Sequence, residues 1–597
     1  TRLTLPDHVG TPGMDNTRAV EALGPALDGL AHHPVVPGPT DPVTVTISAT
    51  DPEGVASVTL WAAVDGAQFA SHPMVGTGAG HYQAVLPGLP GGATVQLVVQ
   101  AQDVAGAKSV FPPRAEGSRA LYRVSEALGD SHGKRVIRIW MTAEDSDWFH
   151  AAPNVMSNDR VRATVVRDDR EVYYDVGVRA KGSERGRVTD LRLGFGVYFN
   201  ADQPFRGAYG SVMIDRSQGV HFGQREWLLN QAMARAGSVS TEYNDLVHLV
   251  APRPAQTGSA ELQLARFGNT MLGAQFDDGA RGQLFEYELI YYPQTTDDGT
   301  DEGQKLPQPD HVLGAGLGAP WADKEAYRHL YLAKNNRRAD DYATLMTRLA
   351  VFDLPDAEFF ATVEDALDTD QWLRAFAFAS LAGVTDQFAS GAAHNAQFYV
   401  RPGDGRLLYF PHDLDFFFGN PTQGLVKNGH LSRLLTQPLY KRAFCGHVVD
   451  LVQTSYNADY MAHWGELMGA MLPEQAVASH LAFLAARVQH VMVDAGDAVQ
   501  TLVPPVDFAI TSHDGADFSV EGDAAVLEGV GWVDVHTISR VDEVSEAPLE
   551  VLWTGATTWQ LVLSLAPGPN PVTLVASDRH GEGLGDSSVV ITSVDGE

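Results

Sequence analysis

The chain has 597 residues, of which 44% are hydrophobic and 19% are charged, a composition typical of globular domains that bury a core. Acidic residues outnumber basic ones by 74 to 42, so the formal net charge is −32. This charge argues against nucleic acids and anionic membranes as partners and favours solubility over an acidic binding surface as its role. No apolar run approaches the roughly 18 residues of a transmembrane segment. Because Thr1 is not a start methionine, we expect a mature or trimmed form of an exported protein whose signal peptide has been removed.

The chain contains a single cysteine, Cys445. One thiol excludes an intrachain disulfide and a zinc site built from several cysteines. Residues 439–449 around it follow a helical pattern, so we interpret Cys445 as a buried structural thiol rather than a nucleophile.

The first 125 residues divide into two predicted parts. A helical pattern around residues 18–30 and a Pro-rich stretch at 32–39 predict an N-terminal extension and linker over residues 1–40. From Val43 the hydrophobic period changes to two, and short alternating runs separated by turns predict a β-sandwich over residues 41–125. This sandwich ends in Ala101-Gln-Asp103-Val-Ala-Gly106, which resembles the last hairpin of immunoglobulin-like or fibronectin-type modules of secreted bacterial proteins.

Residues 126–504 differ in pattern and predict an α+β body of two lobes. Alternating runs at 135–141, 161–166 and 171–179 predict strands, with a helix at 225–236 and further strands over 245–292. From Trp321 onward the helical period dominates, with predicted helices at 324–334, 340–351, 356–367, 369–381, 439–454 and 474–493. One strand pair, 396–400 and 407–410, is embedded in this helical part.

Residues 505–597 return to the alternating pattern and predict a second, acidic immunoglobulin-like sandwich. The run Ala576-Ser-Asp578-Arg-His-Gly581 shares A-x-D-x-x-G with residues 101–106. In both runs we expect the Asp in a tight hairpin turn, where its carboxylate accepts backbone N–H groups and the Gly supplies a positive φ. A Ca²⁺ site at these turns, or in the acidic loop 296–303, is the alternative; we favour plain turns because they need no ion.

The stretch that is most informative about chemistry surrounds the embedded strand pair. Asp386 lies in a loop before the first strand, Asn395 enters that strand, and Asp413 and Asp415 leave the second strand on one side, because strand residues alternate faces. Three carboxylates and an amide therefore converge on one mouth of the hairpin, an oxygen-rich set suited to Mg²⁺, Mn²⁺ or Ca²⁺. A capping role for these carboxylates is the structural alternative, and the residues alone leave both interpretations open.

The middle region also resembles the CotH family, the spore-coat kinases and their secreted relatives, which have an atypical kinase-like fold. The matching motifs follow the family order: a G-x-R-x-[KR]-G turn at Gly177–Ser183, a Gly…Glu strand at Gly282–Glu286, a D…H-N segment with Asp386, His394 and Asn395, and a P-x-D-x-D-x-x-x-G signature at Pro411–Gly419. The late Phe483-Leu-Ala-Ala-Arg487 resembles the closing helix of the family. His412 stands where the family usually has Trp, and Arg192 where relatives often carry Lys.

The resemblance implies a set of site residues and cofactors. ATP with Mg²⁺ or Mn²⁺ would be the cofactors, with Asp386 as the catalytic-loop Asp and Asn395, Asp413 and Asp415 at the metal. In the first lobe the resemblance implies Lys181, together with Arg192, as phosphate-contacting cations. It also implies that Glu286 lies on the strand leading to the hinge between the lobes.

Two functions are compatible with these observations. One is a secreted or cell-surface kinase of bacterial type that transfers the γ-phosphate of ATP to Ser or Thr hydroxyls of a protein substrate. The other is a catalytically inactive structural or adhesive protein that uses the CotH fold to bind a partner in a surface assembly. The flanking sandwiches suit display at a surface, and the chain has no H-R-D triplet, so the sequence leaves both functions open.

Overall fold

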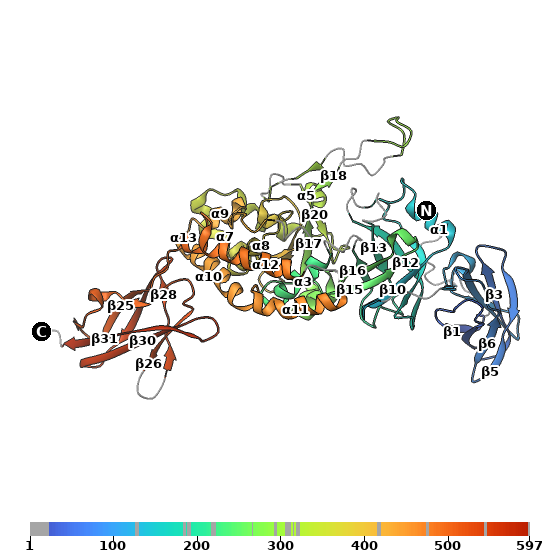
Figure 1. The fold of residues 1–597 in the computed structure, drawn as a ribbon, viewed down its shortest axis with the longest axis horizontal. Helices are drawn as coiled ribbons and strands as arrows, with labels where there is room; N and C mark the ends of the chain where they lie inside the picture. Colours follow the sequence, from blue (N-terminus) through green and yellow to red (C-terminus); the bar gives the residue numbers. More distant parts are fainter. Residues whose placement is uncertain are drawn as a thin grey trace, which may run out of the picture. The chain divides into compact units, whose positions relative to one another are not determined.

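The computed structural model describes residues 23–125, 131–182, 187, 193–215, 223–265, 267–291, 295–304, 312–314, 316–317, 323–414, 420–472, 477–541 and 546–594. It combines α-helices with several separate β-sheets, so the protein is a multidomain α+β chain (Figure 1). Two compact units are present, Thr1–Ser217 with Val247–Ser259 and Gln218–Leu246 with Ala260–Glu597. Among the described residues, none of the helices has the length and apolarity needed to cross a bilayer.

The first unit begins with two sheets that share one hydrophobic core. One sheet has the order β1 (Ala26–His33), β2 (Val43–Thr50), β6 (His81–Leu86), β5 (Val75–Gly78). The other has the order β4 (Ala70–Pro73), β3 (Val55–Val64), β7 (Thr94–Asp103), β8 (Lys108–Phe111), with β9 (Leu121–Arg123) on β7. Alternate residues of β2, such as Val45 and Ile47, point into the core that these sheets enclose.

The prediction of a helix around residues 18–30 is wrong for its described end. Residues 26–33 form strand β1, which pairs antiparallel with β2, and therefore belong to the sheet rather than to an extension or linker. The backbone hydrogen bonds to a neighbouring strand override the weak local helical pattern, as tertiary context commonly does for short segments. Residues 1–22 lie outside the described part.

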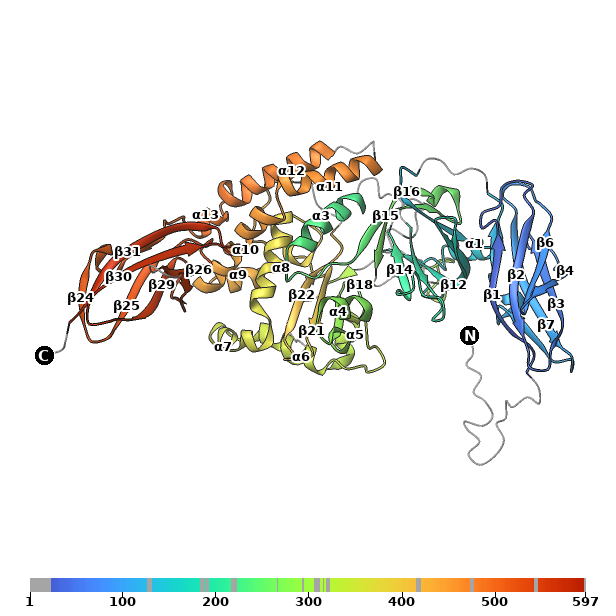
Figure 2. The same ribbon diagram turned by 90° about the horizontal axis from the view of Figure 1, so that it is seen from below.

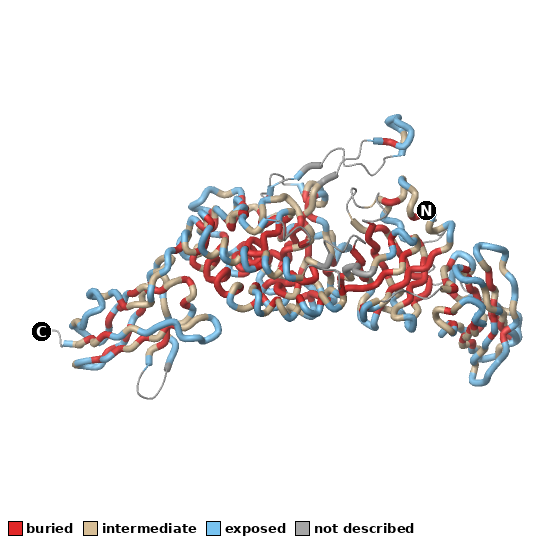
Figure 3. Tube along the Cα trace, in the orientation of Figure 1, coloured by how far each residue is buried: buried red, intermediate tan, exposed pale blue. Residues whose placement is uncertain are grey.

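A closed barrel follows in the first unit. Its strands run in the order β10 (Arg135–Trp140), β11 (Val161–Arg167), β12 (Glu171–Lys181), β13 (Gly194–Tyr198), β14 (Ser211–Ile214), β16 (Gly258–Ala265), β15 (Asn244–Val250). The parallel pairing of β10 with β15 contributes to the closure. Helix α1 (Ala143–His150) follows β10, and inward side chains such as Val165, Val178 and Phe195 fill the interior. Figure 3 shows the buried residues along these strands.

The second unit is built on a four-stranded antiparallel sheet. Its order is β20 (Tyr331–Ala333), β17 (Gln283–Tyr287), β21 (Ala396–Val400), β22 (Leu407–Pro411). The predicted hairpin 396–410 is confirmed as β21–β22. Residues 331–333, predicted as the end of a helix, instead form β20, because β17 offers them a strand partner. A separate pair, β18 (Ile290–Tyr291) and β19 (Val312–Leu313), lies outside this sheet.

The part of this unit that precedes the C-terminal sheets also contains α-helices (Figure 2). They are α3 (Gly223–Arg235), α4 (Asn269–Gln275), α5 (Lys324–Leu330), α6 (Ala343–Leu349), α7 (Asp356–Ala366), α8 (Thr369–Ala382), α9 (Gly429–Leu434), α10 (Pro438–Thr454), α11 (Ala458–Met471), α12 (Val477–Gln489) and α13 (Val499–Leu502). Helix α8 is buried almost throughout: Asp368 caps its start and Gly383, at φ 74°, ends it in the left-handed conformation.

The chain ends in two further sheets around a core of their own. One has the order β23 (Ala509–Ile510), β25 (Ala524–Val530), β29 (Thr558–Ser564), β28 (Leu552–Trp553). The other has the order β24 (Phe518–Glu521), β31 (Gly583–Val594), β30 (Gly568–Ser577), β26 (Thr537–Val541), β27 (Glu546–Pro548). Asp103 and Asp578 both lie in the hairpin turns expected from the sequence, β7–β8 and β30–β31.

Candidate active site

The hairpin β21–β22 presents two residues in a restricted backbone conformation. Asn395 directly precedes β21 with φ 56°, and Asp413 follows β22 with φ 54°. This left-handed region is tolerated best by Gly, Asn and Asp, and non-Gly residues held there cluster at functional sites. The N–H of His412 donates to the carbonyl of Asn395 at 3.3 Å, which keeps the two ends of the hairpin together. The mouth of the hairpin is therefore a fixed platform for both side chains.

The loop after α8 brings Asp386 to the same mouth. His394 Nε2 lies 3.1 Å from Asp386 Oδ1, and the Asn395 amide nitrogen donates to the Asp386 carbonyl oxygen at 2.7 Å. Asn395 is buried, whereas the Asp386 side chain keeps 47% of its surface exposed. Asp386 is thus held by its neighbours while its carboxylate remains open to a reactant.

Glu288, just beyond β17, adds a further carboxylate. Burial raises its pKa, and the negative charges of Asp413 and Asp386 raise it further, against the opposing effects of the Leu289 N–H at 2.9 Å and of His394. Burial alone would lower the pKa of His394, but its bond to Asp386 and the charges of these carboxylates raise it instead. Glu288, Asp386 and Asp413 therefore share one electrostatic environment around one imidazole.

Helix α3 contributes another acidic side chain to Asp413. A carboxylate oxygen of Glu226, which is buried, lies within 4.8 Å of one from Asp413. Glu242, after the same helix, lies 3.8 Å from His412 Nδ1. The carboxylates of Glu226 and Asp413 repel each other at their spacing unless a cation or protons neutralise them. The carboxylates are the hard oxygen donors that Mg²⁺ and Mn²⁺ prefer, so the residues present fit a divalent metal.

A row of polar groups continues from this cluster along one face of the sheet. Glu286 lies directly across from Gln397 in the neighbouring strand, so both side chains share a face, and Glu288 follows two residues later. Glu286 forms an ion pair with Lys334, which comes just after β20. Both partners are mostly buried, with side-chain exposures of 14% and 19%. This face therefore carries a shielded cation within the same unit as the carboxylates.

Helix α8 holds the edge strand that leads to Asp413. The side-chain amide of Gln371 donates to the Tyr409 carbonyl at 2.7 Å and accepts from the Tyr409 N–H at 2.9 Å, so it takes the place of a missing neighbour strand. Trp372 Nε1 donates to the Leu407 carbonyl at 2.8 Å. Figure 2 shows α8 beside β22. The face of the sheet opposite Glu286 and Gln397 packs against buried aromatic rings, including Trp372 against Phe398 with ring centroids 5.4 Å apart.

The structure brings together some of the residues predicted from sequence. Asp386, Asn395 and Asp413 meet at the hairpin mouth, and Glu286 lies on the adjoining strand β17 of the same sheet. Lys181 lies on β12 of the first unit, where its Nζ is 3.1 Å from Asp215 Oδ2, so its phosphate contact remains a prediction. Arg192 and Asp415 lie outside the described residues.

Sequence reasoning assigned no role to several groups of this site: Glu226, Glu288, Lys334 and His394. His394 was within the D…H-N motif, and Glu288 follows Glu286 at the two-residue spacing of one strand face, so His394 and Glu288 carried a usable signal. Glu226 and Lys334 reach the site only through tertiary packing. In the acidic loop 296–303, Asp298 accepts from the Thr300 N–H and Asp297 from the Gln304 N–H, both as turn contacts.

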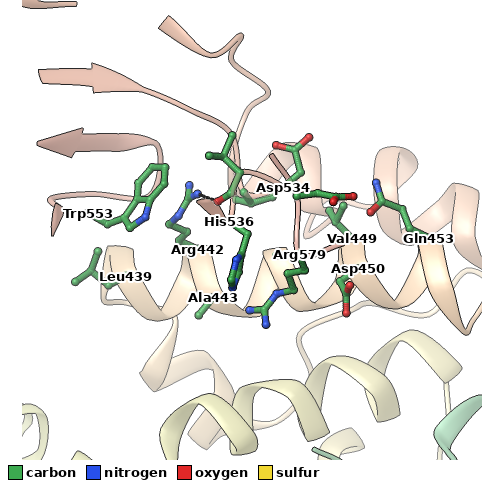
Figure 4. A pocket seen from close by; sticks show the side chains of 14 residues that line it. Leu439, Arg442, Ala443, Val449, Asp450, Gln453, Asp534, His536, Trp553 and Arg579 are labelled. Atoms are coloured by element: carbon green, nitrogen blue, oxygen red, sulfur yellow. Dashed lines mark hydrogen bonds between the residues drawn. The ribbon is translucent and has the colours of Figure 1, made fainter. Parts of the chain in front are cut away.

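A separate cavity of about 390 Å³ lies between α10 and the C-terminal sheets (Figure 4). Arg442 lies in its wall with the guanidinium 3.1 Å from the centroid of the Trp553 ring. It donates to the carbonyls of Val535, Ala556 and Gly531, at 2.6, 2.9 and 3.1 Å. The side chains of the hairpin site do not line this cavity. These contacts occupy the Arg442 guanidinium and join α10 to the C-terminal sheets. We therefore place the proposed chemistry at the hairpin site and not in this cavity.

Comparison with known proteins agrees with the assignment of this region. Residues 298–501 match the family model described as "CotH kinase protein". This segment includes Asp386, Asn395 and Asp413, and the match confirms the CotH resemblance seen in the sequence. Among curated proteins, none matches the chain.

Solved structures give only weak overlays. The Br derivative of BhCBM56 is 16% identical over 15% of this chain and 87% of that chain, with a TM-score of 0.12. A Listeria monocytogenes protein in complex with glucose, magnesium and calcium is 8% identical over 31% of this chain and 17% of that chain, with a TM-score of 0.14. The twitchin kinase region of C. elegans is 8% identical over 94% and 100%, with a TM-score of 0.18. Scores this low carry no argument about fold or activity.

Proposed function

We propose that this protein is an atypical kinase that transfers the γ-phosphoryl group of ATP to a hydroxyl group of a protein, using Mg²⁺ or Mn²⁺. The observation that carries the proposal is the group of Glu288, Asp386 and Asp413 around His394, within the segment that matches the CotH kinase family. Phosphoryl transfer needs little covalent chemistry from the protein and depends on positioning and charge neutralisation. A metal-binding set of carboxylates beside an open Asp suits both requirements.

The proposed roles follow from the contacts. Asp386, exposed and held by His394, orients the acceptor hydroxyl and takes its proton as the new P–O bond forms and the bond to the ADP oxygen breaks. Asp413, Asn395 and Glu288 would hold the divalent ion, which when bound neutralises charge on the phosphates. The ion pair of Lys334 with Glu286 is a further candidate for a phosphate contact. Lys181, Arg192 and Asp415 keep the roles implied by the resemblance as predictions.

We also propose a two-lobed kinase-like body over residues 126–504, flanked by immunoglobulin-like sandwiches over 41–125 and 505–597. A secreted or cell-surface location fits such a chain, because flanking sandwiches of this kind suit display and the net charge of −32 suits an exposed, salt-rich setting. The substrate would then be a surface or secreted protein with an accessible Ser or Thr.

The test is phosphate incorporation measured by mass spectrometry after the pure protein is incubated with ATP and Mn²⁺, alone and with an added protein substrate. We expect phosphorylated Ser or Thr with the natural chain and none with Asp386→Asn. Asp404→Asn is the matched control, because Asp404 lies in the turn at the other end of the same hairpin and pairs with Arg401 at 2.6 Å. If phosphate is absent and nucleotide produces no thermal shift, the non-enzymatic assembly role is the better account.

A further inference from the structure

A second group of carboxylates lies in the first unit, far along the sequence from the hairpin residues. Asp51 and Glu53 belong to the turn that connects β2 to β3, and Asp103 ends β7. One carboxylate oxygen from each of the three lies within 4.8 Å of the other two. The Val104 N–H donates to the Gly54 carbonyl at 3.2 Å, so the two turns are fixed against each other. The proposed kinase chemistry uses none of these residues.

A plain hairpin turn accounts for only one of the two carboxylate oxygens of Asp103. Only 1% of the residue is exposed. Its Oδ1 accepts from the Ala107 N–H at 2.8 Å, which completes the hairpin turn, but its buried Oδ2 has no hydrogen-bond donor among the described residues. A buried carboxylate oxygen without a partner is costly, because its lost hydration is not replaced. That oxygen belongs to the same carboxylate that lies beside Asp51 and Glu53.

No cationic side chain of the described residues neutralises the group. Among the described residues, Asp51, Glu53 and Asp103 form no ion pair with Lys, Arg or His. The matching turn in the C-terminal sheets shows the contrast. There, Asp578 Oδ1 accepts two backbone bonds, from His580 at 2.8 Å and Glu582 at 2.9 Å, and within the described part of the chain Asp578 belongs to no such three-carboxylate group. The two A-x-D-x-x-G turns are therefore alike in sequence but differ in their acidic neighbours.

We propose that Asp51, Glu53 and Asp103 bind one Ca²⁺ ion that joins the β2–β3 turn to the β7–β8 turn. Ca²⁺–oxygen distances of about 2.3–2.6 Å place ligand oxygens up to about 5 Å apart around the ion, which matches the observed spacing. Ca²⁺ accepts irregular geometry and several carboxylates, whereas Mg²⁺ keeps most of its own water and demands a near-octahedral set. The ion would satisfy the buried Oδ2 of Asp103 and offset two of the three negative charges. This site is independent of the proposed kinase activity.

The test is calorimetric titration of CaCl₂ into the full chain after treatment with a chelator. We expect a site that depends on Asp103 and Glu53, with an affinity in the range of roughly 10⁻⁴ to 10⁻³ M typical of extracellular modules and with much weaker binding of Mg²⁺. Asp103→Asn should abolish this binding, and Glu53→Gln should weaken it at least tenfold. Because Glu53 is exposed, its replacement should leave the fold intact and decides the case should Asp103→Asn fail to fold.

Two control variants separate this site from others. Asp578→Asn removes the equivalent carboxylate of the second turn, and Asp413→Asn alters the site proposed for the kinase metal; both should bind this Ca²⁺ as the natural chain does. Absence of Ca²⁺ binding up to millimolar concentration, or binding that both Asp103→Asn and Glu53→Gln leave unchanged, would overturn the proposal. Loss of this binding in Asp578→Asn would likewise assign it elsewhere.

Discussion

Two buried glutamines on neighbouring elements of the second unit should respond oppositely to the same substitution. Gln371 on α8 bonds both the N–H and the carbonyl of Tyr409, in the edge strand that leads to Asp413. Gln397 on β21 is fully buried, and both polar atoms of its side chain lack a hydrogen-bond partner among the described residues. Leucine is similar in volume to glutamine and has no polar atoms. It therefore removes an engaged amide at one position and an unsatisfied amide at the other.

The expected sizes follow from the groups left behind. Gln371→Leu leaves two backbone groups of Tyr409 without their partner, each costing about 1–3 kcal/mol, so we expect a loss of about 3 kcal/mol. For a unit as large as the second one, that loss lowers the unfolding midpoint by about 4 °C. Gln397→Leu removes a buried amide that has already lost its hydration, so its midpoint should equal or exceed that of the natural chain.

Thermal unfolding followed by circular dichroism measures both variants under one condition. A midpoint of Gln371→Leu equal to that of the natural chain, or a midpoint of Gln397→Leu several degrees below it, would contradict these expected effects. Gln371→Leu should also weaken metal–nucleotide binding, because it loosens the strand that carries Asp413. Phosphate incorporation by the two variants at a temperature well below both midpoints checks this link between the edge strand and the site.

Three further expectations concern other buried groups. Burial lowers the pKa of His32 to about 4 in the folded chain, so the neutral imidazole stabilises the fold above pH 6.5, and about 3 kcal/mol is lost as the pH falls from 6.5 toward 4. Unfolding midpoints measured across this range should fall less steeply for His32→Gln; equal slopes would contradict the assignment. Arg442→Lys should lower the free energy of unfolding by about 2–4 kcal/mol, because Lys reaches fewer of the three carbonyls and loses the stacking on Trp553. Because these contacts attach the C-terminal sheets to α10, limited proteolysis of the segment after residue 503 should become faster; an unchanged rate would contradict this. Burial raises the pKa of Cys445 to about 12, so a thiol reagent at pH 8 should label it only after denaturation, and rapid labelling of the native protein would show that it is accessible.

Local patterns predicted individual elements well where a segment decides its own structure. The alternating run from Val43 became β2, Val43–Thr50, and the pattern from Thr369 became α8, whose cap residues Asp368 and Gly383 mark both ends. The closed barrel was not foreseen, because its closure includes the pairing of Arg135 with Val247, and such a pairing leaves no periodic trace in either segment. Helix α11, Ala458–Met471, was missed because its Ala, Gly and Met residues give a weak contrast between faces.

The candidate site was predicted in part for the same physical reason. Asp386, Asn395 and Asp413 lie on or beside one hairpin, so sequence proximity and strand geometry were enough to group them. Glu226 and Lys334 come from α3 and from the end of β20, and only the packed structure shows that they lie near Asp413 and Glu286. The buried, unpartnered oxygen of Asp103 is likewise invisible in a sequence, where its turn looks the same as that of Asp578.

The most direct test of the central proposal is calorimetric titration of ATP with Mn²⁺ into the natural chain, Asp413→Asn and Asp404→Asn. Asn keeps the shape of Asp413 and its left-handed backbone but removes the charge that would hold the metal. We expect the natural chain and Asp404→Asn to bind with equal affinity, and Asp413→Asn to bind at least tenfold more weakly, a loss of about 1.4 kcal/mol. Equal affinity in Asp413→Asn, or no binding by the natural chain, would contradict the assignment of a nucleotide-dependent site to this hairpin.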